Sequence, residues 1–541
     1  MLKLIKKIVL IISISVVTYG DDFINQSIQE SIDSQIVSKA CEGCEIVEIS
    51  LNGLINEVVK RNYNLYTEKV KVNIAKHKVA VEEGIFEPKL QVGASFRRTN
   101  VPNSAEETVS RGFQNNYRDR VKSIETSVSG LLITGGEWKL GFTDRTKGSN
   151  LIRETQDYDT EYSDGLTLSF KQPLLRGMGT DVTYAKINMA KLGTQINATE
   201  YKSKLMDLMA STIRLYWRLY GTQKLYENWT NTLIITEQQL KNIEILAQYG
   251  KIPETEILEV KSSIFQKRTE LYSLKATINE IKNQLLSLLN ISNAGFNSTF
   301  FVVKDRPHIG QNREEFSLED SYQKAINNLP ELKLAELKLA SGKVEHKYHE
   351  NQLLPDLTLN TSISSLGLES TRNNALYCAT GCNGQYSWNV GLNLEIPLYG
   401  NRQAKENLAI SRINLTNSKL AIDSFQKDIY NLITTKIEQL KIEQYKLSEY
   451  RQEVKMKAQL LDIERQKLEL GRSRMKDVLE YEDKLMYAQR KLFSSIVNWK
   501  VAEALLNKAT GELLAKQNIE LSFDEDYQKN TTALNATLLT K

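Results

Sequence analysis

The chain is poor in proline, cysteine, histidine and long hydrophobic runs. Its 541 residues include 8 prolines, 4 cysteines and 4 histidines. Because proline interrupts helices, so few prolines indicate long, unbroken helices. Beyond the first twenty residues no run of eighteen apolar residues occurs, which excludes an ordinary transmembrane helix from the rest of the chain. The net charge of +4 is small for this length and gives no argument for nucleic-acid binding.

Motifs of catalysis are missing as well. The sequence has no Gly-rich phosphate loop, no nucleophile elbow and no zinc-protease helix. His346 and His349 lie three residues apart on an expected helix and could share a metal. Since no carboxylate partner is placed beside them, we interpret them as solvated helix residues. The sequence therefore predicts no enzyme activity, no cofactor and no metal site.

The N-terminus has the pattern of an export signal. Lys3, Lys6 and Lys7 precede the apolar run Ile8–Val17, and small residues follow. This predicts a secretory signal peptide over residues 1–20. The alternative is an N-terminal membrane anchor, for which the apolar run is short.

The cysteines form two close pairs. Cys41 is near Cys44, and Cys378 is near Cys382. In an exported chain this spacing favours two local disulfides. A shared zinc site is the alternative on spacing alone, but neither pair has a histidine nearby.

Strands with one apolar and one polar face precede long helices at two places. Residues 386–396 alternate apolar and polar side chains over eleven residues, about the length of a tilted transmembrane strand, and Pro397 and Gly400 follow. Residues 166–171 alternate in the same way and lead into Pro173. Two further expected strands begin just after Pro88 and Pro355. These four prolines mark the expected strand–helix junctions.

Long helical patterns follow each junction. The first runs over about 182–249 and returns over 253–290, with a tip at Gly250 and Lys251. The second runs over about 402–470 and returns over about 474–510, with a tip at Gly471. At about 1.5 Å per residue, each long helix would measure about 100 Å. We expect two antiparallel helical hairpins.

The two halves of the chain follow the same plan, which indicates an internal duplication. Ser50, Pro88 and Leu90 match Ser317, Pro355 and Leu357 at one offset without gaps. The predicted division is a signal peptide (1–20), an N-terminal arm (21–49), a first repeat (50–290), a linker (291–316), a second repeat (317–515) and a loose C-terminal tail (516–541).

The few strands cannot close a barrel in one chain. The sequence offers four clear strands, and a hairpin at 124–144 either enlarges the outer loops or adds two more. The smallest membrane barrels need about eight strands. We therefore expect copies of the chain to share one barrel, because unpaired strand edges cannot face lipid.

With this order of elements the chain resembles the TolC family of outer-membrane efflux ducts. The motifs are QPLLRG at 172–177, EIPLYG at 395–400, the segment 470–492 around the second tip, and AEALL and ATGELL near the end of the last helix. The resemblance covers about residues 50–515. It implies a homotrimer in which four strands per chain form a 12-stranded β-barrel, continuous with an α-barrel of helical hairpins.

The resemblance also implies a passive role in transport. The duct would sit in outer-membrane lipid, project a tunnel into the periplasm, and serve a tripartite efflux or type I secretion system. Its partners would be a periplasmic adaptor, docked at the helical tips around Gly250, Lys251, Gly471, Arg472 and Arg474, and an inner-membrane transporter.

Acidic residues near the tips are the candidate entrance. By position in the family pattern, Asp477 and Glu480 would ring the tunnel entrance and select cations, with Glu256 and Glu259 as their first-half counterparts. Crowded carboxylates in three copies would raise some of their pKa values. The alternative is that these acids only favour the first turns of their helices.

The residues that close the entrance in this family are replaced by other residue types here. The family's Arg and Tyr fall at Ser473 and Leu468, while Arg472 and Arg474 are adjacent substitutes. A different class of protein, a secreted or periplasmic coiled-coil scaffold or adhesin, is the second hypothesis. It leaves the alternating strands of membrane-spanning length unexplained.

Overall fold

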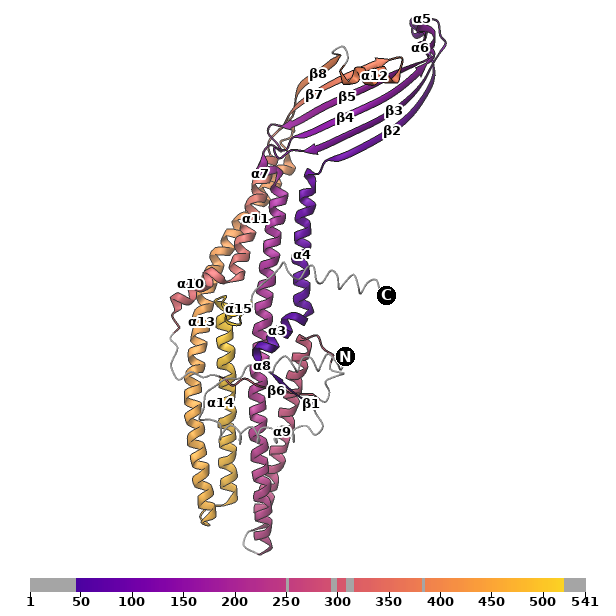
Figure 1. The fold of residues 1–541 in the computed structure, drawn as a ribbon. Coiled ribbons are helices and arrows are strands. Elements are labelled where there is room, and N and C mark those ends of the chain that lie inside the picture. Colours follow the sequence, from indigo (N-terminus) through magenta and orange to yellow (C-terminus); the bar gives the residue numbers. More distant parts are fainter. Residues whose placement is uncertain (1–44, 250–252, 293–298, 308–315, 382–384, 520–541) are drawn as a thin grey trace, which may run out of the picture. The chain divides into compact units, whose positions relative to one another are not determined.

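A computed structural model describes residues 45–249, 253–292, 299–307, 316–381 and 385–519 (Figure 1). The chain divides into two compact units, which are described separately. Unit 1 comprises Met1–Tyr63, Met206–Leu318 and Ile433–Lys541, and unit 2 comprises Asn64–Leu205 and Glu319–Leu432. Two long helices, α8 (Ala185–Gln248) and α13 (Arg402–Glu469), contribute residues to both units. The signal peptide, Cys41 and Cys44 lie outside the described residues.

Unit 2 contains a six-stranded antiparallel sheet, whose strands are labelled in Figure 1. Its order is β2-β3-β4-β5-β7-β8. The strands are β2 (Lys89–Pro102), β3 (Asn116–Leu131), β4 (Glu137–Ser149), β5 (Thr160–Pro173), β7 (Asp356–Glu369) and β8 (Tyr386–Glu395).

The strand count corrects one expectation. The four strands per chain implied by the family resemblance are two too few, because the hairpin at 124–144 forms β3 and β4 inside the sheet. The connection between the first two strands is short. β2 continues to Pro102, and only a short helix, α5 (Ala105–Ser110), separates it from the start of β3 at Asn116.

The sheet has one apolar and one polar face. One row of directly paired residues is apolar on every strand: Leu90, Val128, Leu140, Leu168, Ile363 and Trp388. The adjacent row is polar on every strand: Lys89, Ser129, Lys139, Ser169, Ser362 and Asn389. Around this row the apolar face is open in a single chain, as the 67% exposure of Leu90 and 70% of Trp388 show.

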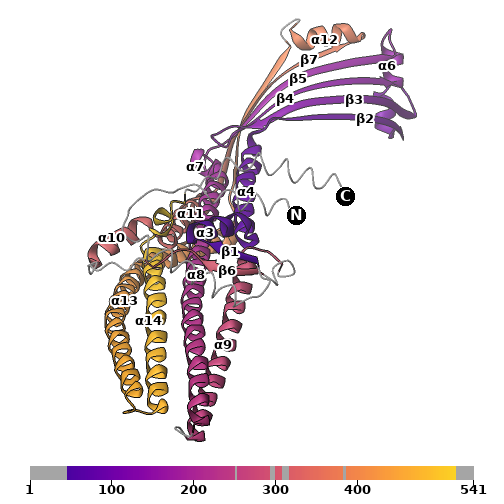
Figure 2. The same ribbon diagram turned by 60° about the horizontal axis from the view of Figure 1, so that its bottom comes forward.

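A short helix covers part of the sheet. α12 (Arg372–Thr380) packs across β7 and β5 and buries Ala375 and Ala379 (Figure 2). Gly367 of β7 allows this close approach, because a Cβ there would lie 2.1 Å from the carbonyl oxygen of Ala375. Another short helix, α6 (Asn150–Thr155), links β4 to β5.

Two helices precede the first strand of the six-stranded sheet. α3 (Leu51–Arg61) ends at Asn62, whose backbone is extended, and α4 (Tyr63–Glu83) begins at the next residue. The Asn62 side chain donates to the carbonyl oxygen of Leu288 at 3.0 Å. The second half breaks at the equivalent place, where α10 (Leu318–Asn328) gives way to α11 (Pro330–Gln352). Pro330 suits a first helical turn because its missing N–H needs no partner there.

The remaining helices of unit 2 are short. The 3-10 turn η1 (Gly84–Phe86) leads from α4 to β2, and α7 (Thr180–Thr183) precedes α8. His346 of α11 lies 2.9 Å from the Ser411 hydroxyl of α13, and His349 lies 3.9 Å from Glu345. Among the described residues no cluster of three or more His, Cys, Asp and Glu side chains could hold a metal ion.

Unit 1 consists mainly of helical hairpins. α8 returns as α9 (Glu254–Leu288), and α13 returns as α14 (Met475–Ala509), followed by α15 (Leu513–Lys516). Each return helix lies beside its partner in both views (Figures 1 and 2). These boundaries confirm the long helices that the sequence predicts. Within the described ranges, no helix combines the length and the apolar character needed to cross a membrane.

A small parallel sheet was not expected. β1 (Glu45–Ile49), from the predicted arm, pairs with β6 (Thr299–Val303), from the predicted linker. Just beyond β6, the Asp305 carboxylate accepts hydrogen bonds from the Leu51 backbone N–H at 2.6 Å and the Tyr216 hydroxyl at 2.7 Å. Asp305 thus fastens the start of α3 to α8.

Candidate functional site

The turn between α13 and α14 contains Gly471, Arg472 and Arg474, and Asp477 and Glu480 follow in the first two turns of α14. Gly471 adopts a positive φ of 67°, which favours glycine, and its N–H donates to the carbonyl oxygen of Leu468 at 3.0 Å. The Arg472 N–H donates to the carbonyl oxygen of Lys467 at 2.8 Å. Arg474 precedes the first residue of α14. Helix α13 therefore ends in a glycine-dependent turn of only a few residues.

The tip between α8 and α9 is described only from Pro253 onward. Gly250 and Lys251 lie outside the described residues. Pro253 caps α9, and Glu256 and Glu259 lie in its first two turns. Within the described ranges, neither carboxylate forms an ion pair. Both remain candidates for the entrance.

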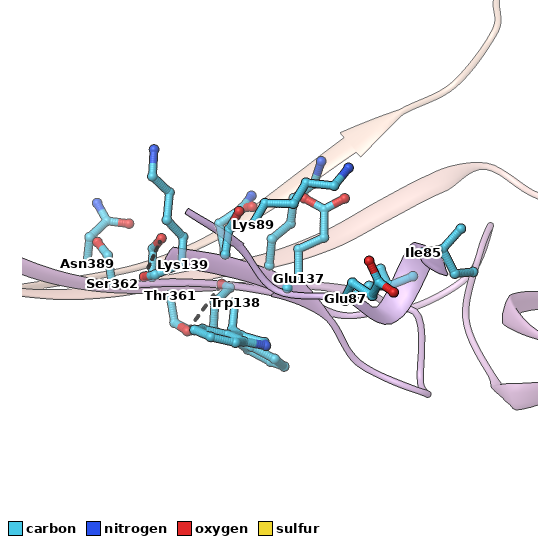
Figure 3. A pocket seen from close by; sticks show the side chains of 16 residues that line it. Ile85, Glu87, Lys89, Glu137, Trp138, Lys139, Thr361, Ser362 and Asn389 are labelled. Atoms are coloured by element: carbon cyan, nitrogen blue, oxygen red, sulfur yellow. Dashed lines mark hydrogen bonds between the residues drawn. The ribbon is translucent and has the colours of Figure 1, made fainter. Parts of the chain in front are cut away.

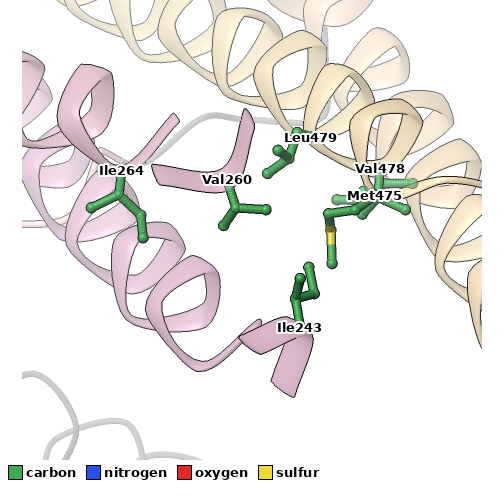
Figure 4. Packing of buried hydrophobic residues seen from close by; sticks show 7 residues of the cluster. Ile243, Val260, Ile264, Met475, Val478 and Leu479 are labelled. Atoms are coloured by element: carbon green, nitrogen blue, oxygen red, sulfur yellow. The ribbon is translucent and has the colours of Figure 1, made fainter. Parts of the chain in front are cut away.

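A hydrophobic cluster joins the two hairpins near their tips (Figure 4). Its buried members come from α8, α9, α13 and α14. They are Ile243, Val260, Ile264, Leu461, Met475, Val478 and Leu479. On each helix the apolar residues recur at heptad-like spacing and form a stripe. Packing the four stripes against each other removes their side chains from water.

The acidic residues lie off this stripe. Val478 and Leu479 are buried in the cluster, whereas Glu480 is exposed and Asp477 is partly exposed. Asp477 accepts a hydrogen bond from the Arg474 backbone N–H at 3.4 Å, which is the role of an acid in a first turn. The structure thus places both acids on the water side of α14, where they are free to face a channel or solvent.

Glu480 has a basic neighbour that the sequence-based interpretation overlooked. Its carboxylate lies 2.6 Å from Lys484, one turn further along α14. The hydrogen bond from Lys484 and its charge lower the pKa of Glu480. In the single chain Glu480 therefore stays ionised at neutral pH, and the rise in carboxylate pKa expected of three crowded copies stays a prediction.

Ser473, at the position of the family's Arg, holds the tip turn together. Its hydroxyl donates to the Glu464 carboxylate of α13, which also lies 3.0 Å from Lys467. The Ser473 hydroxyl and Lys467 lower the pKa of Glu464. Leu468, at the position of the family's Tyr, packs against the hydrophobic cluster. Neither residue reproduces an Arg–Tyr contact.

A buried ionic network links all four helices, and the sequence-based interpretation missed it. Glu482 of α14 and Lys267 of α9 are each 1% exposed, and their charged atoms lie 3.6 Å apart. Glu482 also accepts from Arg465 of α13 at 2.7 Å and from Gln239 of α8 at 3.5 Å. We call Gln239, Lys267, Arg465 and Glu482 the Glu482 network.

The network is surrounded by further cross-hairpin contacts. Arg490 of α14 pairs with Glu270 of α9, and Asn228 of α8 contacts Gln489 of α14 at 3.3 Å. Asp483 lies 3.9 Å from Lys267, and burial raises the pKa of its carboxyl. A buried acid and a buried base at helical spacing from apolar stripes were the available signal, but sequence spacing alone does not show which helix faces which.

The four junction prolines all lie at one end of the sheet. Pro88 and Pro355 immediately precede β2 and β7, Pro173 is the last residue of β5, and Pro397 follows β8. Because neighbouring strands alternate in direction, the starts of β2 and β7 and the ends of β5 and β8 lie at the same end of the sheet. We call it the junction end.

Hydrogen bonds across the junction end replace ladder bonds where the strands stop. Arg176 pairs with Asp356 at 2.5 Å, and its N–H donates to the carbonyl oxygen of Pro355 at 3.3 Å. The Gly177 N–H donates to the Asn351 side chain at 2.7 Å, with a positive φ of 84° at Gly177. The QPLLRG motif is therefore a joint between β5, α11 and β7.

A hollow of about 640 Å³ lies along the junction end (Figure 3). Lys89, Lys139 and Lys171 line it together with Glu87 and Glu137. Figure 3 shows Lys139 and Asn389 on one side of the sheet and Trp138 and Thr361 on the other.

Of the cysteines, Cys378 is within the described residues, at the end of α12. It is disulfide-bonded. Cys382, its predicted partner, lies outside the described residues, so the pairing itself stays a prediction.

Residues 321–512 match the family model of the outer membrane efflux protein. The match lies within the second half of the chain and covers about a third of its residues, so this segment is similar to that family. This confirms the family that the tip and junction motifs indicated. No curated protein matches the chain.

Solved outer-membrane channels share the fold over most of the chain. The structure of VceC from Vibrio cholerae is 16% identical with a TM-score of 0.59, and the match covers 85% of this chain and 96% of VceC. CmeC of Campylobacter jejuni is 14% identical with a TM-score of 0.59, covering 89% and 88%. MtrE of Neisseria gonorrhoeae, solved in an open state, is 14% identical with a TM-score of 0.55, covering 86% and 89%. The outer membrane efflux protein domain therefore belongs to a chain with the outer-membrane channel fold.

Proposed function

We propose that the protein is a trimeric outer-membrane duct, the passive exit of an efflux or type I secretion system. The observation that carries this proposal is the amphipathic sheet, whose apolar face is open in one chain and whose two edge strands lack partners among the described residues. An apolar sheet face this large needs lipid or another chain to cover it. The channel fold and the efflux domain support lipid.

The helical hairpins supply the other part of the duct. Their stripes are buried against each other within unit 1, and their remaining faces are largely polar, with exposed apolar side chains such as Leu258, Phe265 and Tyr272. In three copies such hairpins would line a water-filled tunnel in the periplasm. No covalent chemistry is needed, since a pump elsewhere supplies the energy.

The tips are the proposed contact with the rest of the export machinery. The turn from Gly471 to Arg474 exposes two guanidinium groups on a short, rigid loop, which suits docking to a periplasmic adaptor joined to an inner-membrane transporter. Asp477 and Glu480 follow within the first two turns of α14. We assign them the cation-selective entrance.

Extraction and imaging test the duct against a coiled-coil scaffold or adhesin. The full chain should fractionate with outer membranes, require detergent for extraction, and form a threefold particle. A water-soluble rod without a membrane-embedded end would overturn the duct and support the scaffold.

A further inference from the structure

The sheet has two more strands than the resemblance implies, and their position matters for the pore. β3 pairs with all 14 residues of β2, and β4 pairs along its whole length of 13 residues with β3. β4 then pairs with β5. The β3–β4 hairpin therefore lies between β2 and β5, so it cannot be a flap on the outside of a complete four-stranded sheet.

In the two rows nearest the junction end, the hairpin continues both faces of the sheet. Val128 and Leu140 continue the apolar row between Leu90 and Leu168. Ser129 and Lys139 continue the polar row in the same way. A strand pair with one face for lipid and one for water is what a barrel wall requires.

The turn of the hairpin is fastened at the junction end. The Gly179 N–H donates to the carbonyl oxygen of Thr134 at 3.1 Å, and the Thr134 hydroxyl donates to Gln172 at 3.0 Å. Gly135 has a φ of 85°, and a Cβ there would lie 2.3 Å from the carbonyl oxygen of Gly177. The turn thus reaches the level at which β5 ends, so β3 and β4 span the full height of the sheet.

The free edges of the sheet fit a second copy of the chain. β2 runs away from the junction end and β8 runs toward it, so β8 of one copy and β2 of the next are antiparallel when placed side by side. Six strands are too few to close alone, because the smallest membrane barrels have about eight. Closure by copies removes both edges, as a lipid environment demands.

We propose that the β3–β4 hairpin is part of the barrel wall and that three copies, each with six strands, close an eighteen-stranded barrel. The number of copies rests on the proposed function. With strands about 4.8 Å apart and tilted about 40°, such a barrel has a backbone diameter of about 36 Å, against about 24 Å for twelve strands. The proposed barrel is therefore wider across the membrane than a twelve-stranded barrel would be.

Mass and imaging of the detergent-extracted full chain test this proposal. We expect three copies by native mass spectrometry and a barrel of about 36 Å by single-particle cryo-electron microscopy. Three copies around a barrel of about 24 Å would overturn the eighteen-stranded wall and leave the duct function intact. Two copies would also overturn it. A soluble particle without a barrel would instead overturn the proposed function.

Two sets of variants separate the wall from its edges. Deletion of Asn116–Ser149 removes β3 and β4, keeps the up-and-down order of the remaining strands, and should narrow the barrel to about 24 Å. An unchanged diameter in this variant would contradict the proposal. Paired cysteines keep the test independent of whether the deletion folds.

The cysteine pairs use polar-face positions on the two edge strands. They are Gln91→Cys, Ser95→Cys or Thr99→Cys on β2, each combined with Ser387→Cys, Asn389→Cys or Asn393→Cys on β8. Because β2 and β8 lie at opposite edges of the sheet, a disulfide between them can form only between copies. Oxidation should give a dimer and trimer ladder for at least one pair, and no ladder for any pair would overturn the edge contact.

Discussion

At the scale of single residues, the buried charges near the tips determine more of the helix packing than the exposed acids do. Lys267 and Glu482 are each 1% exposed, while Arg465, the other cation on Glu482, is 38% exposed. Burying two ions costs several kcal/mol each, and a close pair offsets that cost only with further hydrogen bonds. Gln239, Ser263 and Arg465 supply these. The network therefore fixes which helices face each other more than it adds stability.

Removal of one partner should test this interpretation. Lys267→Met leaves Glu482 in a buried site with only Arg465 as a counter-ion, and we expect destabilisation of about 3–5 kcal/mol. The double variant Lys267→Met/Glu482→Gln should recover part of that loss. Denaturant unfolding of the detergent-extracted protein measures both. Equal losses in the single and double variants would contradict a coupled pair.

The pH dependence of the second tip should follow Glu464. Its pKa is lowered by the Ser473 hydroxyl and by Lys467, so the bond contributes stability above the ordinary value of 4.5 and loses it as the pH falls through the lowered value. Ser473→Ala should therefore reduce hydrogen-exchange protection of residues 468–476 at pH 7. At strongly acidic pH, after correction for intrinsic rates, wild type and variant should converge. A constant difference across this range would contradict the mechanism.

At the scale of elements, the fit of α12 on the sheet depends on one glycine. The close approach at Gly367 brings the carbonyl oxygen of Ala375 and the N–H of Ala379 against β7, with no space for a side chain. Arg372 at the start of α12 pairs with Asp144 of β4, which adds a polar anchor at the other end of the contact. Helix α12 is thus packed firmly on the sheet and is not a loose outer loop.

Substitution of that glycine should release α12. Gly367→Ala forces the helix away and should cost about 1–3 kcal/mol, the usual range for overpacking. Cleavage by trypsin after Arg372 should become faster. Gly93→Ala is the matched control, because nothing lies within 4 Å of a Cβ at Gly93, and it should leave cleavage unchanged. Equal cleavage of both variants would contradict the packing.

At the scale of the whole molecule, the proposed duct combines a wide membrane pore with a narrow periplasmic entrance. In three copies, Asp477 and Glu480 would place six carboxylates around the tunnel axis, and Lys484 would offset part of the charge from Glu480. Asp477 is paired with Arg474, whose guanidinium nitrogen lies 3.8 Å from its carboxylate, a longer contact than the 2.6 Å between Lys484 and Glu480. We therefore expect Asp477 to contribute more to cation selectivity than Glu480.

Reversal potentials in planar bilayers measure this difference. Asp477→Asn should lower the cation preference by more than Glu480→Gln, and the double variant should lower it furthest. Glu106→Gln, an exposed acid of α5 on the far side of the sheet from the junction end, is the control and should leave selectivity unchanged. Selectivity unaffected by all three tip variants would return these acids to the role of ordinary first-turn residues.

The sequence by itself determined the elements and the family. Period-two alternation identified β5 and β8, the scarcity of proline identified the long helices, and Pro88, Pro173, Pro355 and Pro397 marked one end of the sheet. These are local signals, in which propensity and hydrophobic period agree over many residues. The sequence located the acids near the tips. It did not show that Lys484 pairs with Glu480, because that contact depends on the helical geometry of α14.

Only the tertiary structure decided how the elements join. Whether residues 124–144 form an outer loop or strands of the sheet depends on their pairing with β2 and β5. β2 ends more than twenty residues before this segment, and no local pattern encodes the pairing. The Glu482 network likewise needs the rotation of four helices to be known. Long-range pairing and helix facing are set by the summed burial of distant residues, so they emerge only when the chain is folded.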